Sequence, residues 1–214
     1  MKLTADWRAG HEQAGLHGRE PMKKGWLVLI VVVVVVLIVG GMYVSSRNTM
    51  VRKNEAIKSD WAQVSVVLER RAELIPNLVA TVKGVAAQEV TVFTAVANAR
   101  ANLMNAQNPK DKIAANQQLD GSLAKVLALT ENYPQLRSNE SFLRLQDELA
   151  GTENRIAVER RRYNNALQDY NAYIGQFPNS TFAGWAGFQR NDAYFAATPA
   201  AQQPPKVEFP PARQ

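Results

Sequence analysis

The hydrophobic positions after residue 56 follow a regular pattern, in which apolar side chains recur in alternating steps of four and three residues. This heptad spacing is typical of helices that pack against other helices. Charge interrupts the stripe only at Arg71 and Glu89. Its apolar members are Ile57, Trp61, Val64, Leu68, Ile75, Leu78, Val82, Val85, Val92, Val96, Ala99 and Leu103. We therefore expect a long helix that reaches about residue 103 and is covered by later helices.

Pro76 and Gly84 are the two positions where this helix is expected to weaken. Proline lacks the amide N–H, and its ring clashes with the carbonyl four residues earlier, so a kink is predicted between Ala72 and Pro76. Pro76 and Asn77 could also form a hinge or a notch for a partner. A fixed kink is the simpler interpretation.

Two later segments carry similar patterns. The run Asn108-Pro109-Lys110-Asp111 combines an N-cap, a proline at the first helical position and an acid in the first turn, which predicts a helix over residues 109–133. A third helix is predicted over residues 139–177, before Pro178. Beyond it, an aromatic, glycine-rich stretch predicts a lid on the end of the bundle and a candidate partner surface. Its members are Phe182, Trp185 and Phe188.

A continuous apolar run, without periodicity, covers residues 26–44. It holds 19 residues without a charge, including six consecutive valines. At about 1.5 Å per residue the run is roughly 28 Å long, close to the hydrocarbon thickness of a bilayer. Trp26 and Tyr43 lie at its ends, where amphipathic rings prefer to sit. We predict an uncleaved transmembrane helix in contact with the lipid bilayer; the alternative is a cleaved secretory signal, for which no small-x-small cleavage site is present.

The predicted fold is all-α, with this N-terminal transmembrane helix followed by a long antiparallel helical bundle over residues 48–195. Residues 1–21 lack periodicity and are predicted to be disordered, and Met22 is an alternative start of the chain. Residues 196–214 contain five prolines and predict a flexible tail. Counts of basic residues around the run place the bundle outside the cell for a start at Met1 and in the cytoplasm for a start at Met22.

Composition excludes most kinds of catalytic site. The chain has no cysteine, and its two histidines, His11 and His17, precede the apolar run. The bundle therefore cannot hold a Ser-His-Asp triad, an HExxH zinc site or Glu-x-x-His iron ligands. We expect no enzymatic activity, no cofactor and no metal. The net charge of +6 is a mild excess, and because the side chains of residues 160–162 point about 100° apart on a helix, no nucleic-acid surface is predicted.

Charged residues within or beside the apolar stripes form a candidate buried polar network. They are Arg71, Glu73, Glu89, Glu153, Glu159 and Arg160. One interpretation is an ion-pair network that switches or binds a partner. The simpler one is a set of polar contacts that fixes the register of the helices at a cost in stability. Asn164 and Asn171 are expected to form hydrogen bonds between helices.

Several of these residues belong to motifs of a known family. The motifs are Arg70-Arg71-x-Glu73-Leu74-Ile75-Pro76-Asn77-Leu78-Val79, Tyr133-Pro134-x-Leu136, Phe142-x-x-Leu145-Gln146-x-Glu148-Leu149-x-x-Thr152-Glu153-Asn154 and Phe177-Pro178-Asn179. With them, residues 22–195 resemble the LemA family. The resemblance implies a bacterial membrane protein with one N-terminal span and a helical bundle on the cytoplasmic side. It brings no established molecular activity.

Together, these predictions favour a non-enzymatic, single-pass scaffold or adaptor of the bacterial inner membrane, which acts through a protein partner or as a homo-oligomer. The alternative is a regulator, or a cofactor-free accessory subunit, of a membrane protease or another membrane enzyme. The sequence does not distinguish a foreign partner from a second copy of the chain.

Overall fold

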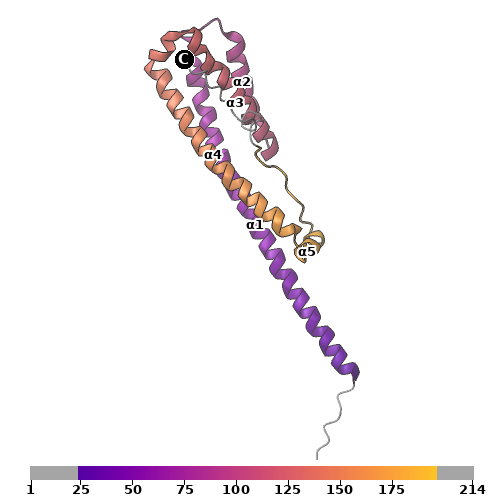
Figure 1. Ribbon diagram of the computed structural model, residues 1–214. Coiled ribbons are helices and arrows are strands. Elements are labelled where there is room, and N and C mark those ends of the chain that lie inside the picture. The colour runs from indigo at the N-terminus through magenta and orange to yellow at the C-terminus, as the bar shows by residue number, and fades with distance from the viewer. Residues whose placement is uncertain (1–23, 197–214) are drawn as a thin grey trace, which may run out of the picture. The chain divides into compact units, whose positions relative to one another are not determined.

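The computed structural model describes residues 24–196, and all regular structure in this part of the chain is helical (Figure 1). The elements are α1 (Lys24–Lys83), α2 (Val90–Asn105), α3 (Pro109–Asn132), the 3₁₀ helix η1 (Pro134–Ser138), α4 (Glu140–Gly175) and α5 (Asn179–Ala186). The predicted all-α fold class is confirmed. The predictions for residues 1–21 and for the tail after residue 196 lie outside the described residues.

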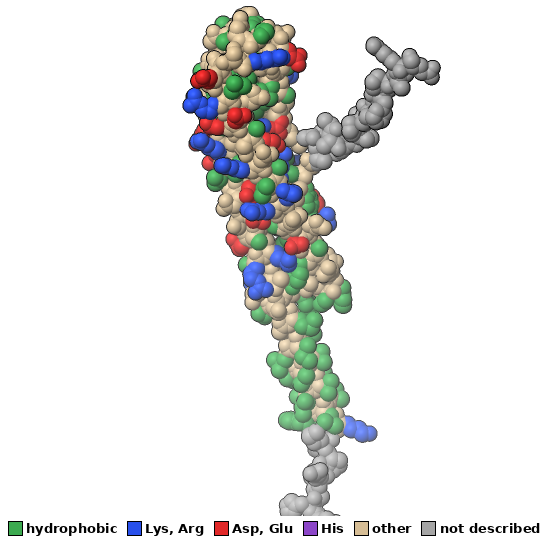
Figure 2. All heavy atoms as spheres, turned by 60° about the vertical axis from the view of Figure 1, so that its left-hand side comes forward, with side chains coloured by type: hydrophobic (Ala, Val, Ile, Leu, Met, Phe, Trp, Pro, Cys, Tyr) green, Lys and Arg blue, Asp and Glu red, His purple; other side chains and the backbone are tan. Residues whose placement is uncertain are grey.

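The chain divides into two compact units. The first unit ends at Met42, and the second begins at Tyr43. In the first unit, every described residue is exposed, although nearly all of them are apolar. This part of α1 is long and apolar enough to cross a bilayer, and Figure 2 shows it as green side chains with no red or blue among the valines. Because so much exposed apolar surface is unfavourable in water, lipid is its natural surrounding.

In the second unit, α1 and α4 lie side by side and run antiparallel. Near the start of the unit, the ring of Trp61 on α1 lies 5.2 Å from that of Tyr163 on α4, measured between centroids. Further along α1, Nη1 of Arg71 donates to Oε2 of Glu153 at 2.6 Å. The partner's number falls as the number along α1 rises, which is the antiparallel arrangement that the sequence predicted.

The prediction of a helix that reaches about residue 103 is wrong at one point: α1 ends at Lys83, and a separate α2 begins at Val90. The chain turns at Gly84, where a Cβ would lie 3.3 Å from a carbonyl oxygen of the preceding helical turn. Ala86 is fully buried and anchors the turn. Gly84 was predicted as a position where the helix weakens, but because the heptad spacing continues on both sides, the pattern of apolar residues did not reveal that the helix ends there.

Asparagine caps fix where α3 and α4 begin. Oδ1 of Asn108 accepts the amide of Asp111 at 2.9 Å, and Pro109 is the first residue of α3, as predicted. Oδ1 of Asn139 accepts the amide of Phe142 at 3.0 Å in the same way. Each cap pairs an amide that the first turn of a helix leaves free.

The apolar stripes meet in one core within the second unit. Burying a side chain of this size contributes about 1.5–3 kcal/mol, so these residues supply most of the favourable free energy of packing. Among the most deeply buried of them are Val64, Leu68, Ile75, Leu78, Val82, Val96, Leu119, Val126, Phe142, Ile156, Tyr163 and Leu167.

Pro76 leaves one carbonyl group of α1 without its usual helical partner. Because proline has no N–H, the carbonyl of Ala72 cannot form the normal bond to the residue four positions later. Arg100 of α2 takes that place, with Nε donating to the Ala72 oxygen at 2.9 Å. Helix α1 continues through Pro76. The carbonyl that the proline leaves without a helical partner therefore serves as a contact point for α2.

Arg100→Met should lower the free energy of unfolding by about 1–3 kcal/mol, because it leaves the Ala72 carbonyl unpaired. In a Pro76→Ala background, the new amide at position 76 can pair with that carbonyl, and the same substitution should cost less. Chemical unfolding in detergent, followed by circular dichroism, gives the four free energies of this double-mutant cycle.

The matched control is Arg161→Met on the exposed face of α4, which should change the free energy of unfolding by no more than about 0.5 kcal/mol in either background. An Arg100→Met cost that is the same with and without the proline would contradict the role assigned to Pro76.

Candidate functional site

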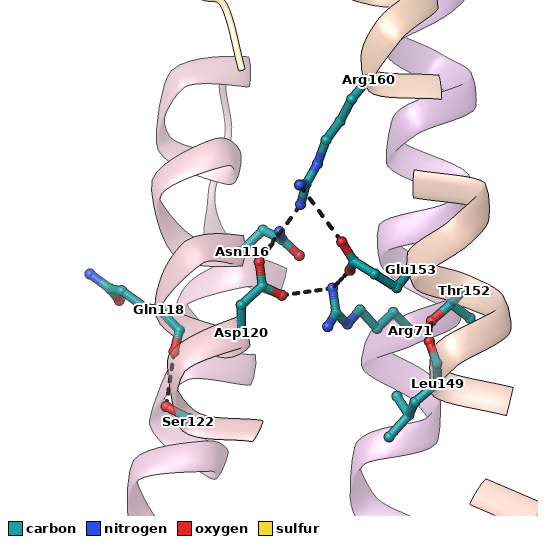
Figure 3. A network of polar contacts seen from close by, with 9 residues as sticks. All are labelled: Arg71, Asn116, Gln118, Asp120, Ser122, Leu149, Thr152, Glu153 and Arg160. Atoms are coloured by element: carbon teal, nitrogen blue, oxygen red, sulfur yellow. Dashed lines mark hydrogen bonds and ion pairs between the residues drawn. The ribbon is translucent and has the colours of Figure 1, made fainter. Parts of the chain in front are cut away.

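An ion network joins α1, α3 and α4 within the second unit (Figure 3). Nη1 of Arg71 on α1 lies 2.7 Å from Oδ1 of Asp120 on α3 and 2.6 Å from Oε2 of Glu153 on α4. Arg160 of α4 lies 3.7 Å from Asp120 and 3.8 Å from Glu153. These four residues form the ion network, in which each arginine faces both carboxylates.

The network is partly buried, and Arg71 is its most enclosed member, with a side chain only 8% exposed. A buried guanidinium without partners costs several kcal/mol, so Arg71 requires both acids. Burial raises the pKa of Asp120 above its usual range, while the nearby Arg71 guanidinium opposes this rise. Nδ2 of Asn116, four residues before Asp120 on α3, donates to the same carboxylate at 3.1 Å.

Phe195 covers the network from the terminal segment, which we define as residues 189–196. Its ring centroid lies 5.1 Å from the guanidinium carbon of Arg160, a distance at which a cation is attracted to an aromatic face. The rings of Trp61 and Tyr163 lie 6.2 Å and 6.0 Å from that of Phe195. Burial, aided by Tyr194, raises the pKa of Tyr163 to about 12, so its hydroxyl stays neutral at physiological pH.

Two asparagines of α4 hold the terminal segment by its main chain. Nδ2 of Asn164 donates to the carbonyl of Phe195 at 2.9 Å, and Oδ1 accepts its amide at 3.0 Å. Asn171 holds Asn191 in the same way, at 2.7 Å and 3.0 Å. An asparagine amide offers one acceptor and a donor beside it, as a peptide group does. The expected partner was another helix, whereas the structure places an extended segment there.

The structure brings together half of the predicted polar network. Arg71, Glu153 and Arg160 meet, and Asp120 is the member that sequence reasoning missed. It follows Leu119 of the apolar stripe of α3, beside the buried face. A usable signal was Asn116 four residues earlier, because the two polar side chains share one face of the helix.

The other three predicted network residues lie elsewhere. Glu73 and Glu159 form ion pairs with arginines three residues away on their own helices, and the side chain of Glu73 is 65% exposed. Oε1 of Glu89 accepts the hydroxyl of Tyr133 at 2.9 Å. Glu73 and Glu159 therefore pair within their own helices, and Glu89, which precedes α2, pairs with the residue that follows α3.

The predicted notch at Pro76 and Asn77 lies on an exposed part of α1. The main-chain carbonyl of Asn77 accepts the hydroxyl of Thr81 at 2.9 Å, a contact within the helix.

The predicted aromatic surface is only partly exposed. Phe182 is buried, and its ring lies 5.7 Å from that of Tyr43. Phe188 is half-buried, whereas 69% of Trp185 is exposed. The preceding Phe177, which was not predicted as part of this surface, is 85% exposed.

The ion network is suited to holding helices together. Arginine does not release its proton in proteins, so neither Arg71 nor Arg160 can act as a general acid or base. Both carboxylates face the same two guanidinium groups, so the four charged groups pair with one another. Within residues 24–196, no group of three potential metal-ligating side chains comes together.

A helical bundle closed by an internal ion network, in a chain that also carries one helix apolar enough to span a bilayer, defines a membrane-associated helical-bundle protein. The model of the LemA family matches residues 60–209, and the chain belongs to this family. The resemblance seen in the sequence motifs is thereby confirmed. The matched region contains all four residues of the ion network.

Three curated relatives are similar to this chain. Magnetosome proteins MamQ 1 and MamQ 2 of Paramagnetospirillum magneticum are each 27% identical in an alignment of 183 residues, gaps included, that covers 73% of this chain and 67% of theirs. Magnetosome protein MamQ of Magnetospirillum gryphiswaldense is 26% identical with the same coverage. Neither the family description nor these names specify a chemical reaction.

Arg71→Leu should lower the free energy of unfolding by about 2 kcal/mol near pH 8, because Asp120 and Glu153 then share only the more distant Arg160. Losing the opposing guanidinium should raise the pKa of Asp120 further. A carboxyl group with a raised folded-state pKa lowers stability above that pKa, and protonation recovers the loss. The deficit should therefore shrink as the pH falls toward about 5, measured by chemical unfolding in detergent.

The control is Arg161→Leu on the exposed face of the same bundle, which should show no such pH-dependent deficit. If Arg71→Leu lowers the free energy of unfolding equally near pH 8 and near about pH 5, uncompensated carboxylates do not cause the loss.

Replacing both Asn164 and Asn171 with alanine should release the terminal segment. The amides of Asn191 and Phe195 lose their acceptors and should exchange with solvent at least about tenfold faster. Hydrogen exchange followed by mass spectrometry measures this rate. Asn165→Ala is the control, because Asn165 is an exposed neighbour on α4; unchanged exchange in the double variant would contradict the clamp.

Proposed function

We propose that this protein is a non-enzymatic scaffold of the bacterial inner membrane, anchored by residues 26–44, which acts by contacting another protein or further copies of itself. The observation that carries this proposal is the ion network, because its charged groups pair with one another and hold three helices in one arrangement. A bundle held in this way presents fixed outer faces to a partner.

The exposed apolar run of α1 supports the anchor. All of its described side chains up to Met42 are exposed, and no charge interrupts residues 26–44. A protein held in a membrane meets other membrane proteins at high effective concentration, so even weak contacts become populated. The family resemblance favours the cytoplasmic side for the bundle.

One outer face offers a place for a partner's apolar side chain. A groove of about 400 Å³ lies between the end of α1 and α2, and it is lined mostly by apolar residues, among them Val79, Val90 and Phe93. Val90 is 63% exposed. Burying such a residue at an interface is favourable, and this supports protein contact as the mode of action.

The curated relatives also fit this proposal. Their names call them magnetosome proteins and specify no reaction. The proposed scaffold role for this chain requires contact with other proteins and no catalytic group.

Photo-crosslinking in native membranes tests the proposal. A benzophenone side chain in place of Val90 or Ala97, which both line the groove, should form crosslinks that mass spectrometry identifies, whereas the same probe at Arg161 is the control. A foreign protein supports an adaptor, and a ladder of the chain alone supports self-assembly. Strict monomers at both test positions would contradict the scaffold role.

The alternative role, regulation of a membrane protease or another membrane enzyme, predicts that the captured protein is such an enzyme. Adding the purified chain should then change the turnover of that enzyme. If turnover stays the same while the crosslink persists, the chain is a scaffold and not a regulator.

A further inference from the structure

The second unit begins at Tyr43, and the end of the bundle next to this residue carries two exposed aromatic side chains. Among residues 43–196, Phe177 and Trp185 are the aromatic members of the exposed large hydrophobic residues, at 85% and 69% exposure. The ring of Trp185 lies 6.5 Å from that of Tyr43 and 5.8 Å from that of Phe182. Tyr43 directly follows Met42 and lies within the apolar run, so these aromatic residues are next to the point where the run ends.

The structure fixes α5 at this end. Oγ of Ser46 on α1 donates to Oδ1 of Asn179, the first residue of α5, at 2.8 Å. Phe182 is buried against Tyr43, which orients the short helix. Trp185, three residues later, packs one side against these rings and leaves most of its surface free. The exposed part of the indole ring is therefore available to a surrounding that accepts an apolar ring.

The same end is basic. Residues 43–54 of α1 contain Arg47, Arg52 and Lys53 and no acidic residue. Residues 170–191, from the end of α4 to the terminal segment, also contain no acidic residue and add one basic residue, Arg190. Arg190 pairs with Asp192, which lies just beyond this range. The two segments are in contact, because the ammonium group of Lys53 lies 5.8 Å from the ring of Tyr173.

We propose that this end of the bundle is a lipid-docking surface, with Trp185 and Phe177 in the membrane interface and the basic residues at anionic headgroups. Tryptophan favours the interface between the hydrocarbon core and water because its ring is apolar while its N–H can reach water. Basic residues beside a bilayer are attracted to anionic lipid. The proposal rests on the membrane anchor of the proposed function and adds a second lipid contact, made by α5.

Tryptophan fluorescence tests this surface directly. The chain has four tryptophans, Trp7, Trp26, Trp61 and Trp185, and replacing the first three with phenylalanine leaves Trp185 as the only reporter. The full chain is reconstituted in vesicles of phosphatidylcholine and phosphatidylglycerol whose acyl chains carry bromine. Bromine near the headgroups should quench Trp185 more strongly than bromine near the bilayer centre, and its emission should shift to the blue.

Two matched chains separate the possible outcomes. A chain that keeps only Trp26 reports the anchor, and a chain that keeps only Trp61, which packs on Tyr163, should escape quenching. If Trp26 is quenched and Trp185 is not, the docking surface is overturned while the anchor stands. If neither is quenched, the anchor fails and the docking surface fails with it. Circular dichroism verifies that each variant is helical, and Trp61 is kept in the reporter chain if its replacement disturbs folding.

The headgroup part of the proposal has its own test. Vesicles of phosphatidylcholine alone should give weaker quenching of Trp185, and Arg47→Gln with Arg52→Gln and Lys53→Gln should abolish the difference between the two vesicle types. Equal quenching in both types by the unsubstituted chain would overturn the role of anionic lipid. Protection of Trp185 from aqueous acrylamide in native membranes, without any quenching by brominated lipid, would mean that a protein covers it and would overturn lipid docking.

Discussion

The desolvated guanidinium of Arg71 is the constraint on which the arrangement of the helices depends. Its side chain is only 8% exposed, so the charge must be balanced inside the bundle. The balancing groups come from two other helices, Asp120 of α3 and Glu153 of α4. A shift of either helix by one turn, about 5.4 Å, would separate an acid from Arg71 and leave the charge uncompensated. Apolar packing alone tolerates such a shift more easily, and this is why a polar contact specifies the register.

The residue after Arg71 extends the same principle to α2. Pro76 cannot donate a proton to the carbonyl of Ala72, and Arg100 of α2 does so instead. Within α1, the guanidinium of Arg71 and the carbonyl of the next residue, Ala72, both lack a partner. Helices α3 and α4 supply the partners of Arg71, and α2 supplies the partner of Ala72. Each is satisfied from outside α1, so unmet polar groups, in addition to apolar area, determine which helices lie against this turn.

Sequence reasoning predicted the features that local rules govern. Heptad spacing, the Asn108 cap and the apolar run each depend on neighbouring residues, and the helices and their antiparallel order followed from them. Asp120 was missed because its charged partners, Arg71 and Arg160, are distant in sequence, and the one local signal, Asn116 on the same helix face, does not identify them. Gly84 was predicted only as a weak point of one long helix, because the heptad spacing persists across it. The difference in exposure between Phe182 and Trp185 was also not predicted, because it depends on packing against the distant Tyr43 and the rest of the bundle.

The terminal segment and the ion network depend on each other. The two asparagine clamps on α4 orient the segment so that its chain runs back along the helix and brings Phe195 over Arg160. The phenyl ring shields Arg160 from water, and shielding strengthens the attraction between Arg160 and its two acids. Release of the segment would expose that arginine and weaken its hold on Asp120, while Arg71 would keep its own pairs. The pairs of Arg71 therefore lie inside the core, whereas the pairs of Arg160 depend on whether the terminal segment is in place.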